Sequence, residues 1–346
     1  MDASATRTGG ASATLGTDWE GPDRSGRSLR MMLSSAGRRV GLMRSFREAA
    51  GALGIDLAMF ACDLKPDWSP ACIEADGSFA APPAESDGFI PAMLDICRRE
   101  RIELIVPTID TELIAYANAR EQFAAINCHV AVSDAPLVEM ARDKLATARF
   151  LTGAGLPSPA TISVEDYLEG SADLPLPLLA KPRHGSSSRG IGMVYDREEV
   201  AALDKSEPYI LQQFLAGREF TISLYFDGEG QLQCAVPHER LRVRSGEVEK
   251  GVTVRDAVMQ DLAWRLGSAL QGARGAMCFQ LRVDADGNAS IFEINARFGG
   301  GYPLAHRAGA RFAQWMLEER LGLPRTAHDG WQEGVLMLRF DDAVFV

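Results

Sequence analysis

Short apolar runs alternate regularly with amphipathic stretches between Leu29 and Ser133. Such runs are typical of buried strands, and apolar residues at the helical period are typical of helices that cover them. The pattern predicts strands at 29–33, 55–63, 102–107 and 129–133, and helices at 40–53, 89–101 and 111–123. Strands that alternate with helices pair in parallel through right-handed crossovers. Residues 29–133 are therefore expected to form one doubly wound α/β domain.

The turn after the first predicted strand reads SSAGR (residues 34–38). A dinucleotide-binding turn at this place carries glycines in the spacing G-x-G-x-x-G, which these residues lack. Asp63 does end the second predicted strand, where an acid can bind a ribose. Because the glycine spacing is wrong, we do not expect NAD to bind, and we expect the domain to act as a scaffold.

The remainder of the chain has the pattern of an α+β module. The predicted elements are a helix at about 135–153, strands at 176–182, 191–194 and 209–215, a hairpin at 219–243, a helix at about 254–271 and a hairpin at 277–295. Asp-Gly turns at 227–230 and 285–288 fold each hairpin back on itself. Residues 134–346 are taken as one module that contains a small mobile subdomain at about 160–215.

Composition and charge restrict the kinds of partner. The net charge is −11 over 346 residues and no basic block offsets it, so a nucleic-acid partner is not expected. No apolar run reaches membrane-spanning length, and residues 1–28 are rich in Gly, Ser, Thr and Asp, which predicts a disordered extension rather than a signal peptide. Six cysteines occur without any CxxC pair, which favours reduced thiols in a cytoplasmic protein.

The stretch FEINARFGGG (292–301) carries the most specific chemistry. Glu293, Asn295 and Arg297 occupy alternate positions, so in a strand they leave the same face. The preceding hairpin strand contributes Gln280, which can converge on Glu293 and Asn295. Carboxylate and amide oxygens suit Mg²⁺, which also accepts phosphate and water ligands. The alternative is a solvated surface hairpin, but it leaves the arginine and the three glycines unexplained.

A glycine- and serine-rich loop follows Lys181 in the stretch KPRHGSSSRGIG. Flexible backbone N–H groups and hydroxyls suit phosphate oxygens, and the lysine adds a positive charge. The stretch is not a Walker A motif, because G-x-x-x-x-G-K is absent. An ordinary surface turn is the alternative interpretation.

Residues 212–219 join two predicted strands through Ala216-Gly217, a candidate hinge. Backbone groups near Gln213 and Phe214 can pair with the edge of an adenine, and Glu219 can accept ribose hydroxyls. Considered alone, Glu219 has the pattern of an ordinary exposed acid. Lys144 lies early in a predicted helix, where a lysine is usually solvated.

The order of these elements resembles the ATP-grasp superfamily, and in particular its carbamoyl-phosphate-synthase-like carboxylate–amine ligases. The resemblance covers residues 29 to about 320 and is strongest over Gln280–Gly301. It implies an ATP-grasp fold behind an N-terminal pre-ATP-grasp domain, with ATP and Mg²⁺, or Mn²⁺ in its place, as cofactors. Gln212 departs from the glutamate that family members often carry, and Gln280 departs from the acid of many ligases.

The resemblance also implies roles for individual residues. The implied phosphate contacts are Lys144, Lys181 and a closing loop that contains Gly185, Ser186, Ser187, Ser188 and Gly190. The implied adenine and ribose contacts are Gln212, Gln213, Phe214 and Glu219. The implied metal ligands are Gln280, Glu293 and Asn295, and Arg297 reaches the transferred phosphate.

The implied reaction is an ATP-dependent ligation. ATP converts a carboxylate into an acyl phosphate, an amine displaces the phosphate, and ADP and phosphate are released. Arg240, Arg242 and Arg244 alternate on the strand VPHERLRVR and are expected to share a face, where they can bind the acid. The alternative is a solvated basic strand edge. His238 and Glu239 are candidate general bases.

Several alternatives stay open at the level of the sequence. The acid is expected to be an amino acid or another acidic metabolite, but neither it nor the amine is identified. A bicarbonate-activating enzyme similar to carbamoyl phosphate synthase is a second hypothesis, and a non-catalytic ATP-binding regulatory protein is a third. Whether the chain forms a homodimer is also left open.

Overall fold

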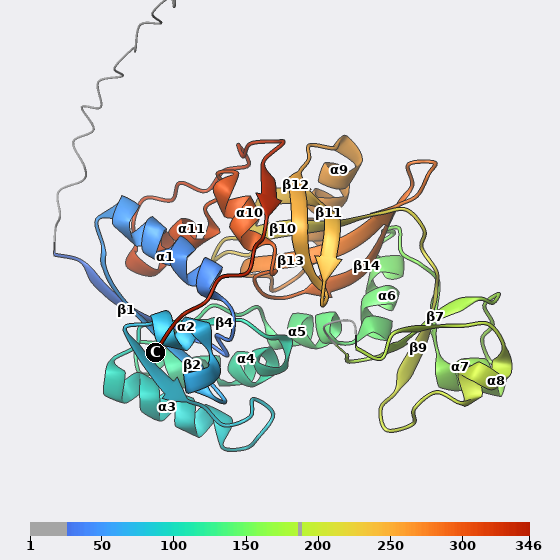
Figure 1. Cartoon of the computed structure of the whole chain (residues 1–346), viewed down its shortest axis with the longest axis horizontal. Coiled ribbons are helices and arrows are strands. Elements are labelled where there is room, and N and C mark those ends of the chain that lie inside the picture. The colour runs from blue at the N-terminus through green and yellow to red at the C-terminus, as the bar shows by residue number, and fades with distance from the viewer. Residues whose placement is uncertain (1–25, 186–188) are drawn as a thin grey trace, which may run out of the picture.

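Three β-sheets organise the computed structural model, which describes residues 26–185 and 189–346. The expected extension at 1–28 lies almost wholly outside the described residues. A five-stranded sheet lies at the lower left of Figure 1, a six-stranded sheet at the top centre and a four-stranded sheet at the right. The predicted fold class, a parallel α/β domain followed by antiparallel sheets, is confirmed.

The five-stranded sheet is entirely parallel, with strand order β3-β2-β1-β4-β5. Its strands are β1 (Ser28–Ser34), β2 (Asp56–Asp63), β3 (Gly77–Ala80), β4 (Leu104–Pro107) and β5 (His129–Val130). Strand β3 was not predicted, because its four residues are half-exposed and give no apolar run. The strand expected at 129–133 is wrong beyond Val130, where the regular ladder ends.

Helices cover both faces of this sheet. They are α1 (Val40–Leu53), the 3₁₀ helix η1 (Pro66–Trp68), α2 (Pro70–Glu74), α3 (Phe89–Glu100) and α4 (Asp110–Ala124). Met31 and Leu33 of β1 share a core with Phe46 of α1, whereas Met32 shares the opposite core with Tyr116 of α4. Alternate side chains of a strand point to opposite faces. The domain is therefore doubly wound, as predicted.

The strand order reverses between β1 and β4, so the loops after these two strands part at the carboxyl edge of the sheet. Glu112 of α4 is fully buried and ties the two loops together. It accepts hydrogen bonds from the Ser34 hydroxyl (2.5 Å) and from the Thr108 backbone N–H (2.7 Å). Asp63 accepts from the Gly37 N–H (2.9 Å) and so holds the turn after β1. This edge of the sheet is where open α/β domains bind ligands.

The helix expected at 135–153 is wrong as a single element. It consists of α5 (Ala135–Arg142) and α6 (Lys144–Gly153), which are separated at Asp143. Asp143 adopts an extended conformation, and its carboxylate accepts hydrogen bonds from the N–H groups of Leu145 (2.9 Å) and Ala146 (3.2 Å). An aspartate at this position caps the second helix and so ends the first. As a result, Lys144 is the first residue of α6.

The four-stranded sheet has the order β6-β9-β7-β8 and a small core of its own. Its elements are β6 (Thr161–Ser163), α7 (Val164–Glu169), β7 (Leu178–Pro182), β8 (Gly192–Val194), α8 (Arg197–Ala201) and β9 (Tyr209–Gln213). Tyr167 and Val200 of the two helices pack against Leu211 of β9. The mobility expected of residues 160–215 stays a prediction.

The six-stranded sheet has the order β14-β13-β10-β11-β12-β15. Its strands are β10 (Arg218–Phe226), β11 (Leu232–Arg244), β12 (Glu247–Thr253), β13 (Gly275–Val283), β14 (Ala289–Asn295) and β15 (Leu336–Leu338), and its helices are α9 (Ala257–Ala269), α10 (Tyr302–Arg307) and α11 (Phe312–Leu321). Both predicted hairpins are confirmed. Strand β12 was missed because its charged sequence, EVEKGVT, lacks the clear alternation of a half-buried strand.

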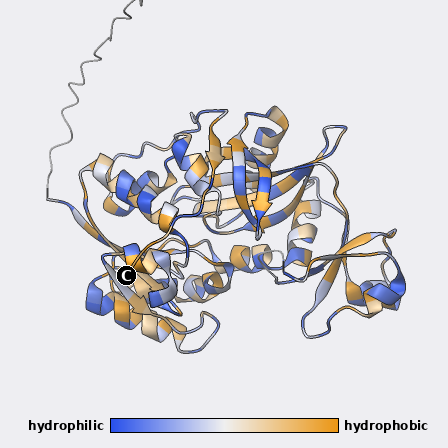
Figure 2. Ribbon diagram, in the orientation of Figure 1, coloured by the Kyte–Doolittle hydropathy of each residue, from blue (hydrophilic) through white to orange (hydrophobic). Residues whose placement is uncertain are grey.

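Both large hydrophobic cores contain residues of the parallel sheet and of the six-stranded sheet. Helix α1 lies beside α10 and α11 in Figure 1, and the Phe46 ring meets the Phe298 ring edge-on at 6.0 Å. In Figure 2 these helices carry both hydrophobic and hydrophilic residues, as expected of helices with one buried face. Phe298 directly follows Arg297, so this packing fixes the end of β14 against the first domain. No helix in the described ranges is long and apolar enough to cross a membrane.

Gly217 provides a test of the link between the small sheet and the large one. Its φ is +102°, and a Cβ there would lie 2.0 Å from the Val283 carbonyl oxygen. Gly217→Ala is therefore expected to lower the free energy of unfolding by about 2–4 kcal/mol, through backbone strain and this collision. Gly287→Ala is the control, because its φ of +87° is also strained but its surroundings are open. Equal losses in urea unfolding of the two variants would contradict the collision.

Candidate active site

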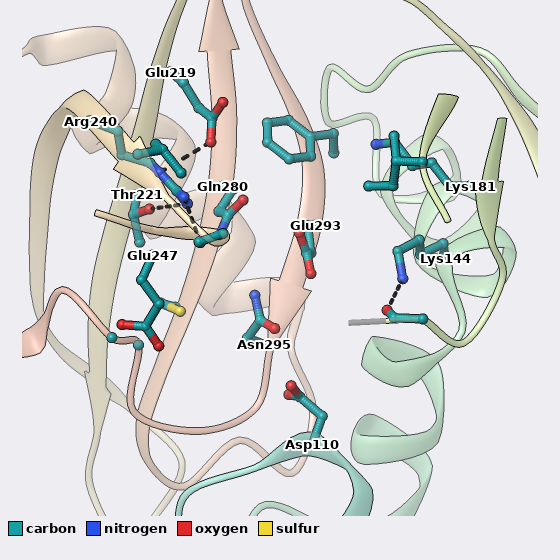
Figure 3. A pocket seen from close by; sticks show the side chains of 18 of the residues that line it. Asp110, Lys144, Lys181, Glu219, Thr221, Arg240, Glu247, Gln280, Glu293 and Asn295 are labelled. Atoms are coloured by element: carbon teal, nitrogen blue, oxygen red, sulfur yellow. Dashed lines mark hydrogen bonds and ion pairs between the residues drawn. The ribbon is translucent and has the colours of Figure 1, made fainter. Parts of the chain in front are cut away.

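A cavity of about 700 Å³ lies where the three sheets meet, and all three contribute residues to its lining. Figure 3 shows side chains of the large sheet on one side of the cavity, and Lys144 and Lys181 on the other. The lining carries seven basic residues against four acidic ones, although the whole chain has a net charge of −11. The excess of basic side chains favours an anionic ligand.

Gln280, Glu293 and Asn295 point into the cavity from neighbouring strands (Figure 3). Gln280 of β13 lies directly opposite Glu293 of β14, and Asn295 lies opposite Cys278. The three expected metal ligands are therefore brought together. Across the described ranges, no group of three or more His, Cys, Asp or Glu residues could hold a metal ion. One carboxylate and two amides suit Mg²⁺ only when phosphate or water oxygens complete the coordination.

Arg297 lies at the end of this row and pairs with Asp110 of the parallel-sheet domain. Its guanidinium is 2.9 Å from the Asp110 carboxylate, and it also donates to the Asn295 side-chain oxygen (3.1 Å). Burial acts to lower the pKa of Arg297, but the charge and hydrogen bond of Asp110, together with Cys278 and Glu293, outweigh burial and raise the pKa above its ordinary value. The cavity therefore holds a permanent positive charge at the place expected for the transferred phosphate.

Lys181 is the last residue but one of β7 and is 6% exposed. Its ammonium donates to the Gln212 side-chain oxygen (2.7 Å) and lies 5.0 Å from the centre of the Phe292 ring. Gln212 in turn donates to the Thr161 hydroxyl (2.9 Å). Burial lowers the pKa of Lys181 to about 8. Gln212 thus positions a lysine that lacks a carboxylate partner among the described residues, and a phosphate can supply the missing negative charge.

Lys144 approaches from α6, where its ammonium donates to the Gly185 carbonyl oxygen. Burial lowers its pKa as well. Gly185 lines the cavity; Gly190, with φ at +68° and no room for a side chain beside Tyr209, is not among the described lining residues. Ser186, Ser187 and Ser188 lie outside the described residues, so their expected role stays a prediction.

The residues expected around the nucleoside also reach the cavity. Gln213 and Phe214 follow Gln212, and the Phe214 side chain is 51% exposed. The Glu219 carboxylate is held between Arg240 (3.1 Å) and Arg282 (2.6 Å). A carboxylate with two arginine partners is a fixed group rather than the free acid that its sequence alone indicated.

The expectation that Arg240, Arg242 and Arg244 share a face is wrong. Two irregularities in the pairing of β11 with β12, on either side of Arg242, break the alternation. Arg240 lines the cavity with a side chain that is 5% exposed, whereas Arg242 and Arg244 are not among the described lining residues. Arg242 is 64% exposed and pairs with Glu249 (2.8 Å), and Arg244 pairs with Asp341 (2.6 Å).

Neither candidate general base lines the described cavity. His238 is fully buried, and neither ring nitrogen has a hydrogen-bond partner within the described ranges. Burial lowers its pKa to about 3, so the ring is neutral. Glu239 pairs with Arg218 at 3.3 Å. The structure therefore gives these two side chains no access to a ligand in the cavity.

The three glycines after Arg297 make room for protein side chains. A Cβ on Gly299 would lie 2.9 Å from Cys278 Sγ, one on Gly300 would overlap the Glu247 carboxylate, and one on Gly301 would lie 2.6 Å from His238 Nε2. Each of the three glycines therefore lies against a protein side chain. They let β12 and β11 close against the end of β14.

Sequence reasoning missed the residues that the parallel sheet contributes. Arg39 follows β1, and Thr108, Asp110 and Thr111 follow β4; all four line the cavity. These positions flank the point where the strand order reverses, which is the usual ligand-binding edge of such a sheet. A predicted strand order would have indicated them. Glu247 was missed together with strand β12.

Comparison with known proteins agrees with this architecture. The family model described as PylC-like, N-terminal domain matches residues 31–131, and the ATP-grasp domain model matches residues 141–301. The chain is an ATP-grasp superfamily protein with a PylC-like N-terminal domain, related to carbamoyl phosphate synthase, phosphoribosylamine–glycine ligase and D-alanine–D-alanine ligase.

Three curated relatives show how limited the sequence similarity is. Phosphoribosylamine–glycine ligase of Listeria monocytogenes is 23% identical over 60% of this chain and 56% of that protein. The carbamoyl phosphate synthase large chain of Clostridium beijerinckii is 25% identical over 46% of this chain and 16% of that protein. D-alanine–D-alanine ligase of Marinomonas is 33% identical over 25% of this chain and 30% of that protein. Each of these three matches covers 56% or less of the relative's own length.

Solved structures share the fold. The biotin carboxylase domain of Hydrogenobacter thermophilus 2-oxoglutarate carboxylase, solved with MgADP, ADP and bicarbonate, superposes with a TM-score of 0.70 at 16% identity, over 88% of this chain and 72% of that one. L-amino acid ligase from Bacillus licheniformis superposes with a TM-score of 0.64 at 21% identity, over 87% and 76%. These likenesses establish the fold alone.

The buried charge of Lys181 gives a pH-dependent prediction. Lys181→Met is expected to stabilise the ligand-free protein by roughly 1–3 kcal/mol at neutral pH, because methionine has no charge to desolvate. The pKa of Lys181 in the folded protein, about 8, lies below the ordinary lysine value of 10.5. Between these two pH values the unfolded state therefore binds more protons than the folded state does. The contribution of Lys181 to the free energy of unfolding of the wild type should therefore increase with pH over this range. Lys181→Met should lack this increase.

Urea unfolding across that pH range measures the difference. Lys205→Met is the control, because Lys205 is exposed and its charge stays hydrated in the folded state. Equal pH slopes in the wild type and in Lys181→Met would contradict a buried lysine with a lowered pKa.

Proposed function

We propose that the protein is an ATP-dependent ligase that activates a carboxylate as an acyl phosphate and joins it to an amine, with release of ADP and phosphate. One observation carries this proposal. A buried lysine (Lys181), a half-buried lysine (Lys144), a permanently charged arginine and the Gln280–Glu293–Asn295 set converge on one cavity. The relatives include enzymes named as ligases that join amino acids or amines, which supports the same reaction class.

The chain's own residues suit phosphoryl transfer, in which the protein mainly positions groups and neutralises charge. Bound ATP with Mg²⁺ would supply the phosphoryl group and the charge of the cation. Gln280, Glu293 and Asn295 would hold the cation, since Glu293 has no ion pair within the described ranges and its charge is free for a ligand. Lys144 and Lys181 would bind phosphate oxygens, and Gln213 and Phe214 would contact the adenine.

The cavity is built to bind anions at several points rather than to carry a catalytic base. In the described lining, Asp110, Glu219 and Glu247 are each held by arginine. Phosphate and carboxylate oxygens can therefore bind arginine and lysine donors, and Glu293 is the one carboxylate of the described lining that no arginine holds. An amine that arrives neutral needs no base from the protein, which agrees with the burial of His238.

Nucleotide binding is the first test. ATP with Mg²⁺ should raise the melting temperature of the full chain, since a ligand at about a hundredfold above its Kd stabilises the native state by about 2.7 kcal/mol. Omission of Mg²⁺ should reduce the shift, and NAD should give none. A melting temperature that ATP and Mg²⁺ leave unchanged would rule out the proposed nucleotide site.

Turnover is the second test. Glu293→Gln should reduce ADP formation roughly hundred- to thousandfold, because it removes the one carboxylate of the expected cation site. Asp286→Asn is the control, since Asp286 is exposed at the turn of the same hairpin. Near-normal turnover in Glu293→Gln would show that Glu293 does not hold the cation.

A hydroxylamine-trapping screen across amino acids and bicarbonate would identify the activated acid, since acyl phosphates yield hydroxamates. ADP formation with bicarbonate alone would favour the enzyme similar to carbamoyl phosphate synthase. ATP binding with no ADP formation across the screen would favour the non-catalytic regulatory protein.

A further inference from the structure

Three segments far apart in the sequence meet at Glu247, the first residue of β12. Its carboxylate pairs with Arg39 of the loop after β1 (3.0 Å) and with Arg339, which follows β15 (3.1 Å). The Arg339 guanidinium also donates to the Gly300 carbonyl oxygen. Glu247 therefore sits against the glycine loop that ends the row of expected cation ligands.

Of the two arginines, only Arg39 is among the described residues that line the cavity. Its Nη1 atom donates to Glu247, and its Nε and Nη2 atoms have no hydrogen-bond partner in the part of the chain that the structure describes. These two nitrogens are not fully buried, and the Arg39 side chain is 22% exposed. A guanidinium has five donors in a planar fork that matches a carboxylate. Arg39 therefore presents unused donors to the cavity.

The charges around Arg39 do not balance. Arg39, Arg297 and Arg339 share two carboxylates, those of Asp110 and Glu247. Burial lowers the pKa of Arg39; Glu247 opposes this effect, whereas Arg297 and Arg339 add to it. These five residues therefore carry one positive charge in excess, on side chains that are only partly exposed to water. One bound anion would restore the balance.

The position of Arg39 in the fold is also that of a ligand-binding residue. It follows β1, and the start of α4 follows β4, so the two flank the point where the strand order reverses. The hydrogen bonds of Asp63 to Gly37 and of Glu112 to Thr108 hold both loops in place. Open α/β sheets bind their ligands in this crevice. The fold and the charge count thus indicate the same spot independently.

We propose that Arg39 binds the carboxylate of the acid substrate and that Glu247 occupies Arg39 until the acid arrives. The inference rests on the proposed ligase function and assigns the substrate-binding residue within it. In the exchange, the acid replaces Glu247 on Arg39, and Glu247 keeps its ion pair with Arg339. No carboxylate is left unpaired in either state, so the exchange avoids the large cost of an isolated buried charge. The ligand class is a carboxylate anion rather than a cationic amine.

A nucleotide phosphate is the other anion that could reach the cavity. The lysines expected to bind phosphate, Lys144 and Lys181, come from α6 and β7, whereas Arg39 lies with β12 and the glycine loop. We therefore assign Arg39 to the acid, and the test includes ATP as a separate arm.

The test uses the full chain and sodium acetate as the probe, with sodium chloride at equal ionic strength as the reference. Ligand-observed NMR titrations would compare the wild type with Arg39→Gln, Glu247→Gln and Arg44→Gln. Arg44 lies on the helix that follows Arg39, but it is exposed and pairs with Glu74. Arg39→Gln should weaken acetate binding roughly ten- to hundredfold, because a charge-assisted hydrogen-bond pair is lost. Arg44→Gln should bind as the wild type does.

Glu247→Gln gives the result that separates exchange from a structural clamp. If Glu247 competes with the acid for Arg39, this variant should bind acetate several-fold more tightly than the wild type. If the three residues only hold the fold together, both Arg39→Gln and Glu247→Gln should weaken binding, and the proposal is overturned. Arg39→Lys keeps the positive charge but lacks the forked donors of a guanidinium, so its affinity for acetate should lie between those of the wild type and Arg39→Gln. If Arg39→Gln is unstable, Arg39→Lys should still bind acetate more weakly than the wild type does.

Melting curves with ATP and Mg²⁺ on the same variants separate this proposal from the proposed function. Arg39→Gln should keep the wild-type shift; loss of that shift would make Arg39 a phosphate ligand and overturn the assignment. Absence of the shift in the wild type would refute the nucleotide site instead. Two outcomes would refute the carboxylate site and leave the nucleotide site intact. In both, the melting shift with ATP and Mg²⁺ is preserved; in one, the wild type and Arg39→Gln bind acetate equally well, and in the other, neither binds acetate.

Discussion

The ion pair between Asp110 and Arg297 joins the two halves of the molecule inside the cavity. Asp110 begins α4 of the parallel-sheet domain, and Arg297 follows the last strand of the hairpin that carries the expected cation ligands. Both side chains are largely withdrawn from water, so removal of either would leave a costly unpaired charge. The aromatic contact of Phe46 with Phe298 holds the same junction from the apolar side. The site is complete only when the two halves are docked.

Arginines determine how the remaining charges of the cavity are arranged. Glu219 has two arginine partners, Glu247 has two, and Asp110 has one. Glu293 is the only acid of the described lining that has no ion pair in the described ranges. Its charge acts to raise the pKa values of Lys144 and Lys181, against the effect of burial. This arrangement leaves one carboxylate free among an excess of basic side chains, which is the charge pattern expected for the proposed activation of an acid by ATP.

Local patterns predicted the elements that carry their own signal. The alternation of apolar strands and amphipathic helices indicated the parallel domain, and the Asp-Gly turns fixed both hairpins, so Gln280 and Glu293 could be expected to meet. Predictions were wrong where one side chain changed the backbone locally. Asp143 split the predicted helix by capping α6, and irregular pairing beside Arg242 turned that residue away from the cavity. A period of two or of 3.6 residues cannot reveal such events, because they depend on a single cap or a single unpaired residue.

The sequence by itself determined which residues could carry the chemistry of β14, because the period of a strand places Glu293, Asn295 and Arg297 on one face whatever surrounds it. It also determined that strands and helices alternate in the first domain. Only the tertiary structure decided the partners. Arg39, Asp110 and Glu247 come together from loops and an edge strand with no shared motif, and what unites them is the cost of leaving buried charges unpaired. That cost acts between segments about two hundred residues apart, a distance over which local pattern carries no information.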